Sequence, residues 1–198
     1  MRRRLVQLYL GLGLYGVSSS LLVLAGLGLD PWNVFHQGLA RHSGLAIGTW
    51  SILVGVVVLL LWIPLRQRPG IGTISNVVAI GAVMDLVLGT VSPPHALGWR
   101  IACLVAGTVL NGVATGAYIG AGLGPGPRDG LMTGLAARGH SIRVVRTGLE
   151  LTVLATGWLL GGTVGVGTVV YAVSIGPLAH VFVPLFAYDA PEPVIDAV

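Results

Sequence analysis

Long apolar runs, separated by short clusters of Gly, Pro, Asn, Asp and Arg, make up most of this chain of 198 residues. A membrane-spanning helix needs about 20 mainly apolar residues. Six segments meet this requirement: Leu5–Ala25, Ile47–Leu65, Ile71–Val91, Gly98–Ala121, Ile142–Gly162 and Val166–Phe186. The pattern therefore predicts an all-α polytopic membrane protein with six transmembrane helices.

Two further segments, Pro31–His42 and Pro127–Arg138, are too short to span a bilayer. Each begins with Pro, whose fixed φ suits the first turn of a helix. In the first segment, Trp32, Phe35 and Leu39 form an apolar stripe at helical spacing. Such a stripe is typical of an interfacial helix that lies flat on the membrane.

The short helices could instead be re-entrant, with their N-termini inside the membrane. A helix N-terminus exposes unpaired N–H groups and partial positive charge, which suit an anion or a carboxylate. In that arrangement Asn33, His36, Gln37 and Asp129 would line a ligand-binding cavity. The sequence leaves both arrangements open.

The second half of the chain repeats the first. Gly11–Gly28 aligns with Gly107–Gly124 at an offset of 96, with 8 of 18 positions identical. After the loss of one residue in a loop the offset becomes 95, and the sequence GxGT at 70–73 aligns with GxGT at 165–168. An odd number of spans in each repeat means that the second repeat enters the membrane from the opposite side.

The expected architecture is therefore a pair of inverted three-helix repeats, residues 1–92 and 93–187, each with one short helix after its first span. In transporters built in this way the binding site lies near the midplane, where the repeats meet. Residues 188–198, with two prolines and several acidic residues, are predicted to form a disordered cytoplasmic tail.

Three segments carry a resemblance to a known family: GLGLDPWNVF at 26–35, IGTWS at 47–51 and GIGT at 70–73. In this order they resemble the YczE/YyaS/YitT family of bacterial integral membrane proteins, on its YczE side. The resemblance covers Leu8 to Phe186 and implies a small bacterial inner-membrane protein with no established substrate. Arg128-Asp129 stands where the first half has Trp32-Asn33, so the two halves differ chemically.

Composition and charge agree with a membrane protein. Charged residues make up only 9% of the chain, against about 25% in soluble domains. All eleven basic residues are Arg, in short clusters between apolar runs, which is typical of topology signals and not of a nucleic-acid-binding face. With the N-terminus inside, nine of them, including Arg128, lie on the cytoplasmic side, and only Arg41 and Arg100 lie outside. We therefore expect a multi-pass protein of the bacterial cytoplasmic membrane, with both termini cytoplasmic, lipid around it and no nucleic-acid partner.

Three ionisable residues, Asp85, Glu150 and His180, fall within predicted spans. Glu150 lies near the middle of its span, where it either serves proton coupling or a cationic ligand, or pairs with Arg146 one helical turn earlier. Asp85 and His180 occupy equivalent repeat positions away from the midplane. We expect each to lie near headgroups or a loop, in a structural or coupling role.

Asn111, in the middle of a span, either contacts a ligand or hydrogen-bonds a neighbouring helix. Gly112, Gly116, Gly120 and Gly124 recur every four residues and predict a close helix-packing face, within the chain or in a homodimer. The five histidines lack metal-ligand spacing, the lone Cys103 suits packing, and no nucleophile is paired with a base. No metal, cofactor or enzymatic activity is expected.

The leading functional hypothesis is a small transporter or exporter of an unknown small molecule or lipid, working by alternating access about a midplane site. One alternative is a non-transporting protein, such as an assembly factor or the ligand-binding subunit of a larger membrane complex. Another is a channel or lipid-moving protein.

Overall fold

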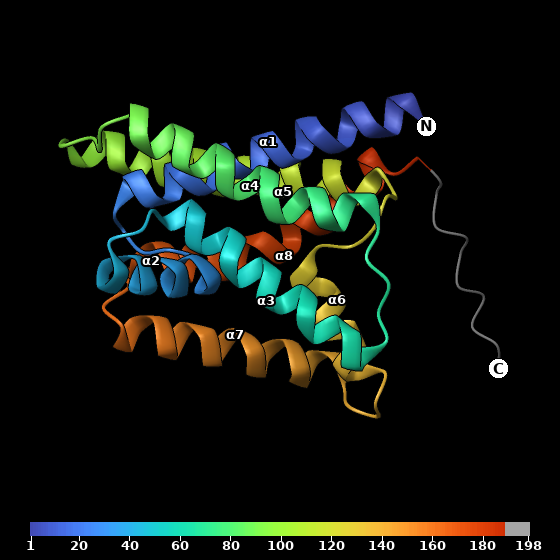
Figure 1. The fold of residues 1–198 in the computed structure, drawn as a ribbon. Helices are drawn as coiled ribbons and strands as arrows, with labels where there is room; N and C mark the ends of the chain where they lie inside the picture. The colour runs from blue at the N-terminus through green and yellow to red at the C-terminus, as the bar shows by residue number, and fades with distance from the viewer. Residues whose placement is uncertain (189–198) are drawn as a thin grey trace.

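The computed structural model describes residues 1–188, whose regular structure is entirely helical (Figure 1). The predicted tail, apart from its first residue, lies outside the described residues. Every helix end lies within three residues of its predicted position. The helices are α1 (Arg2–Ala25), α2 (Pro31–Ser43), α3 (Ile47–Leu65), α4 (Ile71–Thr90), α5 (Leu97–Gly120), α6 (Pro127–Ala136), α7 (Ile142–Leu159) and α8 (Val166–Phe186).

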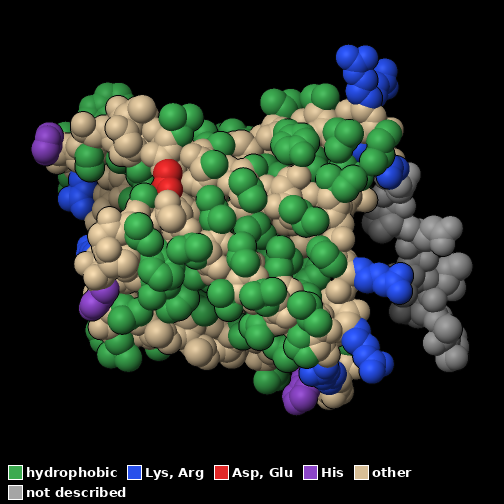
Figure 2. Space-filling view, in the orientation of Figure 1, with side chains coloured by type: hydrophobic (Ala, Val, Ile, Leu, Met, Phe, Trp, Pro, Cys, Tyr) green, Lys and Arg blue, Asp and Glu red, His purple; other side chains and the backbone are tan. Residues whose placement is uncertain are grey.

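Five of these helices, α1, α3, α4, α5 and α8, are long and apolar enough to cross a membrane. The helix α7 has the length but carries Arg143, Arg146 and Glu150 within its 18 residues, and it is not among the five. Hydrophobic side chains cover much of the molecular face in Figure 2, whereas arginines gather at its two ends. The prediction of an all-α polytopic membrane protein is confirmed, and the sixth span stays a prediction.

The helices form two layers (Figure 1). In the first layer α1 and α5 pack side by side and run in opposite directions, with α4 against α1 and α8 against α5. The second layer consists of α3, α2, α6 and α7. In this layer each of the short helices, α2 and α6, packs between α3 and α7. The helix α3 also packs on α4 and joins the layers along one edge.

Both short helices begin near the middle of the molecule. The non-helical residues 26–30 and 121–126 run back from the ends of α1 and α5, and α2 and α6 then run outward again (Figure 1). Along α2, Trp32, Val34 and His36 are all buried, between α3 and α7. This burial favours the re-entrant arrangement of α2 over the interfacial one.

The two return segments pack in the same way, each against the opposite half of the chain. The N–H of Gly72, at the start of α4, donates to Leu123 O at 2.8 Å, and the N–H of Gly167, at the start of α8, donates to Leu27 O at 2.8 Å. The next residue in each segment is a glycine with positive φ, +116° at Gly28 and +123° at Gly124. Only glycine adopts these angles readily, so the repeated GLG and GxGT motifs form reciprocal contacts between the halves.

The glycines of α5 form its contact with α8. A Cβ atom at Gly112 would lie 2.6 Å from Leu178 Cβ, and one at Gly116 would lie 2.6 Å from Phe182 O. Gly120 is equally close to Phe186 O, at 2.5 Å. Gly124 lies beyond the helix, against Gly70 and Thr73. The structure thus uses the glycine face for packing within the chain.

Replacing Gly116 by Leu should lower the free energy of unfolding by roughly 1–3 kcal/mol, because the side chain would overpack the α5–α8 contact. Thermal unfolding in detergent measures the effect. Gly98→Leu is the matched control, since it lies on the same helix and a Cβ there meets nothing within 4 Å. Equal stability of the two variants would contradict the predicted packing.

Candidate functional site

A cavity of about 480 Å³ lies between the two layers, and all eight helices contribute residues to its wall. The short helices contribute the residues at their N-termini, Asp30 to Asn33 and Gly126 to Asp129. Several of the longer helices contribute residues from the middle of their length, such as Tyr15 of α1 and Ile175 of α8, whereas α5 contributes Thr115, Tyr118 and Ile119 from its last turns. The cavity is therefore central along most of the longer helices.

Much of the cavity wall is made of equivalent positions in the two halves. The conservative pairs are Ser19 with Thr115, Pro31 with Pro127, and Ile80 with Ile175. In other pairs an uncharged residue of the first half is replaced by a charged one in the second half: Trp32 with Arg128, Asn33 with Asp129, Ser51 with Arg146, and Gly55 with Glu150. The cavity thus has a symmetric framework and an asymmetric charge distribution.

The N-terminus of α2 is capped by a buried carboxylate. The backbone N–H of Asn33 donates to Asp30 Oδ1 at 3.3 Å, and Asn33 Nδ2 donates to Asp30 Oδ2 at 2.5 Å. A carboxylate at this position satisfies the free N–H groups of the first turn and interacts favourably with the helix dipole. Asp30 is therefore satisfied within α2.

The same contacts define the protonation of His36. Because Asn33 presents its NH₂ group to Asp30, its Oδ1 faces His36 and accepts a hydrogen bond from Nδ1–H at 3.3 Å. This assignment leaves Nε2 as a lone-pair acceptor, and among residues 1–188 this buried atom has no hydrogen-bond partner. Burial, and then the positive charge of Arg128, lower the pKa of His36 well below its usual value, so the ring is neutral.

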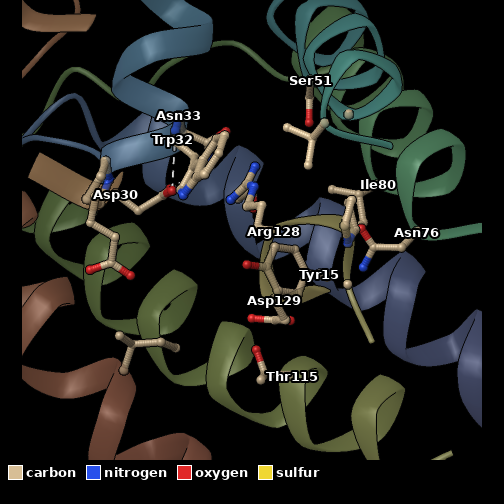
Figure 3. Close-up of a pocket in the computed structure, with 18 of the residues that line it drawn as sticks. Tyr15, Asp30, Trp32, Asn33, Ser51, Asn76, Ile80, Thr115, Arg128 and Asp129 are labelled. Atoms are coloured by element: carbon tan, nitrogen blue, oxygen red, sulfur yellow. Dashed lines mark hydrogen bonds between the residues drawn. The ribbon is translucent and has the colours of Figure 1, made fainter. Parts of the chain in front are cut away.

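Arg128 and Asp129 extend from the first turn of α6 in different directions (Figure 3). The Arg128 guanidinium lies over the Trp32 ring, 4.7 Å from its centroid, in a cation–π contact. Asp129 Oδ2 accepts a hydrogen bond from Tyr118 OH at 3.1 Å, and Tyr118 packs edge-to-face on Tyr15. Within the part of the chain that the structure describes, Arg128 makes no ion pair and no hydrogen bond through its side chain.

Both interpretations of Glu150 find a counterpart in the structure. Glu150 Oε1 lies 3.1 Å from Arg146 Nε on the same face of α7, and both residues line the cavity. Their side chains are 36% and 58% exposed, so the pair adds only a few tenths of a kcal/mol to stability. Glu150 is therefore both paired and accessible from the cavity.

Two of the candidate residues, Gln37 and Asp85, lie outside the cavity wall and hold backbone segments in place. Gln37 Oε1 accepts a hydrogen bond from the N–H of Thr163 at 2.6 Å, which holds the α7–α8 connection against α2. Asp85 accepts hydrogen bonds at 2.7 Å from the N–H of Gly48 and the hydroxyl of Thr49. Asp85 thus fixes the start of α3 to α4, whereas its repeat mate His180 is exposed on α8.

Asn111 lies behind the cavity wall. Its Nδ2 donates to Ser18 Oγ at 2.9 Å, and its Oδ1 accepts from Tyr171 OH at 2.8 Å. Tyr171 itself lines the cavity. Asn111 therefore links α1, α5 and α8 and orients a cavity tyrosine.

Arg128, Trp32 and the tyrosines Tyr15, Tyr118 and Tyr171 were not among the residues chosen from sequence. The positive-inside pattern treats Arg128 as a topology signal, although the structure places it in the cavity. The signal that could have identified it was its alignment with Trp32. Among residues 1–188, no group of three or more His, Cys, Asp or Glu is arranged to hold a metal ion.

Replacing Asn111 by Leu should lower the free energy of unfolding by roughly 1–3 kcal/mol, because the hydroxyls of Ser18 and Tyr171 both lose a buried partner. Tyr171→Phe should cost less, and the double variant should be less destabilised than the sum of the two. Thermal unfolding of the three variants in detergent measures this coupling. Strictly additive effects would show that the Asn111–Tyr171 contact is not formed.

The chain is similar to three uncharacterized bacterial proteins, one of which is named a membrane protein. It is 42% identical over 181 residues to an uncharacterized protein of Haemophilus influenzae, covering 91% of this chain and 83% of the relative. It is 36% identical over 172 residues to the uncharacterized membrane protein YczE of Bacillus subtilis, covering 86% and 80% of the two chains. It is 29% identical over 187 residues to the uncharacterized protein YyaS of the same organism, covering 90% and 92%.

No solved structure matches the chain. The YczE and YyaS relatives confirm the resemblance noted from the sequence motifs. A family of unknown function, DUF6198, matches residues 2–184, and the chain therefore belongs to the DUF6198 family.

Proposed function

We propose that this protein is a small transporter of the bacterial cytoplasmic membrane, with six spans in two inverted repeats and alternating access to the central cavity. The observation that carries the proposal is that two equivalent helix pairs differ: α3 packs on α4, whereas α7 and α8 make at most marginal contact. The cavity lies between these pairs. One side of it is thus closed and the equivalent side is open.

The closed side is held by a glycine contact and a carboxylate. Gly48 and Gly81 bring the backbones of α3 and α4 together so closely that a Cβ on either would collide with the other helix. Asp85 then accepts hydrogen bonds from Gly48 and Thr49. We call these four residues, Gly48, Thr49, Gly81 and Asp85, the α3–α4 clasp.

The equivalent positions on the open side lack such a clasp. Gly176 corresponds to Gly81, and a Cβ built on it meets nothing within 4 Å. Arg143 stands in the place of Gly48 and His180 in the place of Asp85, and both are exposed. The separation of α7 from α8 lies toward the end of the molecule where α1 begins (Figure 1).

Exchanging the conformations of the two repeats would close α7 on α8 and open the α3–α4 clasp. Alternating access in inverted-repeat transporters occurs by such an exchange around a fixed site. With the arginine-rich N-terminus in the cytoplasm, the open side faces the cytoplasm, and the structure corresponds to an inward-facing state. Of the five charged residues that the described part of the chain contributes to the cavity wall, all except Asp30 belong to the second repeat, and in this proposal they make the charged contacts with the ligand.

Opening of the clasp can be tested by cysteine accessibility. In a Cys103→Ser background, Ser51→Cys provides a thiol on the cavity wall of α3. Asp85→Asn should accelerate labelling of this thiol by a membrane-impermeant maleimide from outside by about tenfold, because hydrogen bonds to a charged group contribute roughly 1.5–3 kcal/mol. His180→Asn, at the equivalent position without such bonds, should leave the rate unchanged. Equal labelling rates with and without the Asp85→Asn substitution would show that the clasp is no gate.

Transport itself requires a flux measurement. The molecules retained by the purified protein would be identified by mass spectrometry, and their labelled forms offered to proteoliposomes. Saturable uptake that Gly48→Leu abolishes, while Gly98→Leu largely retains it, is the expected result, since Gly48 lies in a crowded helix contact and Gly98 does not. Stoichiometric binding with no flux would favour a non-transporting ligand-binding subunit, and unsaturable flux would favour a channel.

A further inference from the structure

We propose that the cavity ligand carries an anionic group, a carboxylate or a phosphate, which binds the Arg128 guanidinium and the N-terminus of α6. This inference rests on the ligand-binding role proposed for the cavity. It assigns a specific residue and a chemical class to that role. Arg128 is the recognition residue in this arrangement.

The Arg128 guanidinium forms no ion pair among residues 1–188, although Asp30, Asp129 and Glu150 also line the cavity. The carboxylates along the cavity wall each have a nearer partner: Asp30 bonds Asn33, Asp129 bonds Tyr118, and Glu150 pairs with Arg146. Within residues 1–188 the only such interaction of the Arg128 guanidinium is its cation–π contact with the Trp32 ring. A cation removed from bulk water requires a counter-charge or hydrogen-bond acceptors, and an anionic ligand supplies both. The planar guanidinium suits a carboxylate or phosphate because it donates two parallel hydrogen bonds.

The first turn of α6 adds donors at the same place. Asp30, which caps α2, is replaced by Gly126 at the start of α6, and no side chain caps that helix. Among the described residues, the backbone N–H groups of Arg128 and Asp129 have no hydrogen-bond acceptor. The second repeat has thus lost the capping carboxylate and has a cation in place of an aromatic ring. Its own carboxylate, Asp129, lies in the first turn but bonds Tyr118 and not these N–H groups, which leaves them free to bind an anion.

A second, independent observation indicates that the polar wall lacks a partner. His36 lines the cavity and is 1% exposed, and its Nε2 has no hydrogen-bond donor among residues 1–188. Buried polar atoms are usually satisfied by protein, water or ligand. Because Nε2 is an acceptor that is itself buried, a donor such as a ligand hydroxyl or a water reaches it only if a neighbouring side chain moves.

The wall also has an apolar part, which suits the body of an amphiphilic anion. Valines and methionines from α3, α4 and α6 and Ile175 of α8 face the cavity: Val54, Val58, Val77, Met84, Met132 and Ile175. The anionic group could belong to a membrane lipid, which would reach the cavity between α7 and α8, or to a free organic acid or phosphate. Both sources share the same chemistry at Arg128.

Binding can be measured on the full chain in phosphatidylcholine nanodiscs by the shift of thermal unfolding. The probes are inorganic phosphate, octanoate and its neutral counterpart octanamide, and phosphatidate added to the nanodisc lipid. We expect at least one anionic probe to stabilise the wild type and octanamide to have little effect. Arg128→Gln should raise the anion concentration needed for the same thermal shift at least about tenfold, since charged hydrogen bonds are lost. Arg143→Gln, which removes an exposed arginine outside the cavity wall, should retain it.

Arg128→Lys provides a variant that keeps the charge and should retain part of the response, because a lysine cannot form the bidentate contact. Stabilisation by phosphatidate alone would assign the anion to a lipid, and stabilisation by octanoate or phosphate would assign it to a soluble molecule. Absence of any anion response, or an equal response in wild type and Arg128→Gln, would overturn the proposal.

Flux measurements separate this inference from the proposed transport. Arg128-dependent binding of an anion without flux in proteoliposomes would refute transport and leave the anion site in place. Saturable flux of a neutral or cationic molecule that Arg128→Gln does not change would refute the anion site and leave transport in place. Saturable anion flux that is lost in Arg128→Gln and kept in Arg68→Gln, which removes an exposed arginine of the α3–α4 connection outside the cavity wall, is the result expected if both proposals hold.

Discussion

The fold depends on how backbone groups are satisfied where its helices are interrupted. In a bilayer an unpaired N–H or C=O group costs several kcal/mol, and irregular backbone is tolerated only where protein or a water-filled cavity surrounds it. Here the return segments after α1 and α5 are held by hydrogen bonds from Gly167 to Leu27 and from Gly72 to Leu123. Because each bond joins the two halves, neither half can form its own return segment alone. The same bonds direct α2 and α6 to the centre of the molecule, which is why their N-termini line one cavity.

That arrangement explains which features the sequence could predict. Hydropathy located the helices, since the length of an apolar run indicates both that the element is a helix and where it begins and ends. The motif pairs GLG and GxGT showed the internal repeat, although not that each GLG segment contacts the GxGT segment of the other half. Arg128 was not chosen as a site residue because the positive-inside pattern counts arginines by position along the chain. It takes no account of a segment that folds back into the molecule. The sequence also could not predict that α7 and α8 are apart. Gly81 and Gly176 are both glycines at equivalent positions, and they differ only in the residues that lie opposite them in the structure.

In the proposed transport cycle, the unequal chemistry of the repeats makes the two end states unequal in energy. The inward-facing state is stabilised by the α3–α4 clasp, in which glycine backbones meet and Asp85 is satisfied. In the exchanged state α7 would close on α8 through positions occupied by Arg143 and His180. Arg143 has a bulky charged side chain where the first repeat has a glycine, and His180 offers no carboxylate to receive its charge. The outward-facing state therefore has a weaker clasp of its own.

A ligand changes this balance only if it binds the two states differently. The polar groups on the second-repeat side of the cavity, Arg128 and the open N-terminus of α6, are attached to the half whose helices α7 and α8 are apart. An anion bound there pairs with Arg128, which has no ion-pair partner among residues 1–188. The ligand would thus supply in the second repeat the negative charge that Asp85 supplies in the first. This gives the asymmetry between the repeats a physical role, because closure on one side would depend on the protein alone and closure on the other on its cargo.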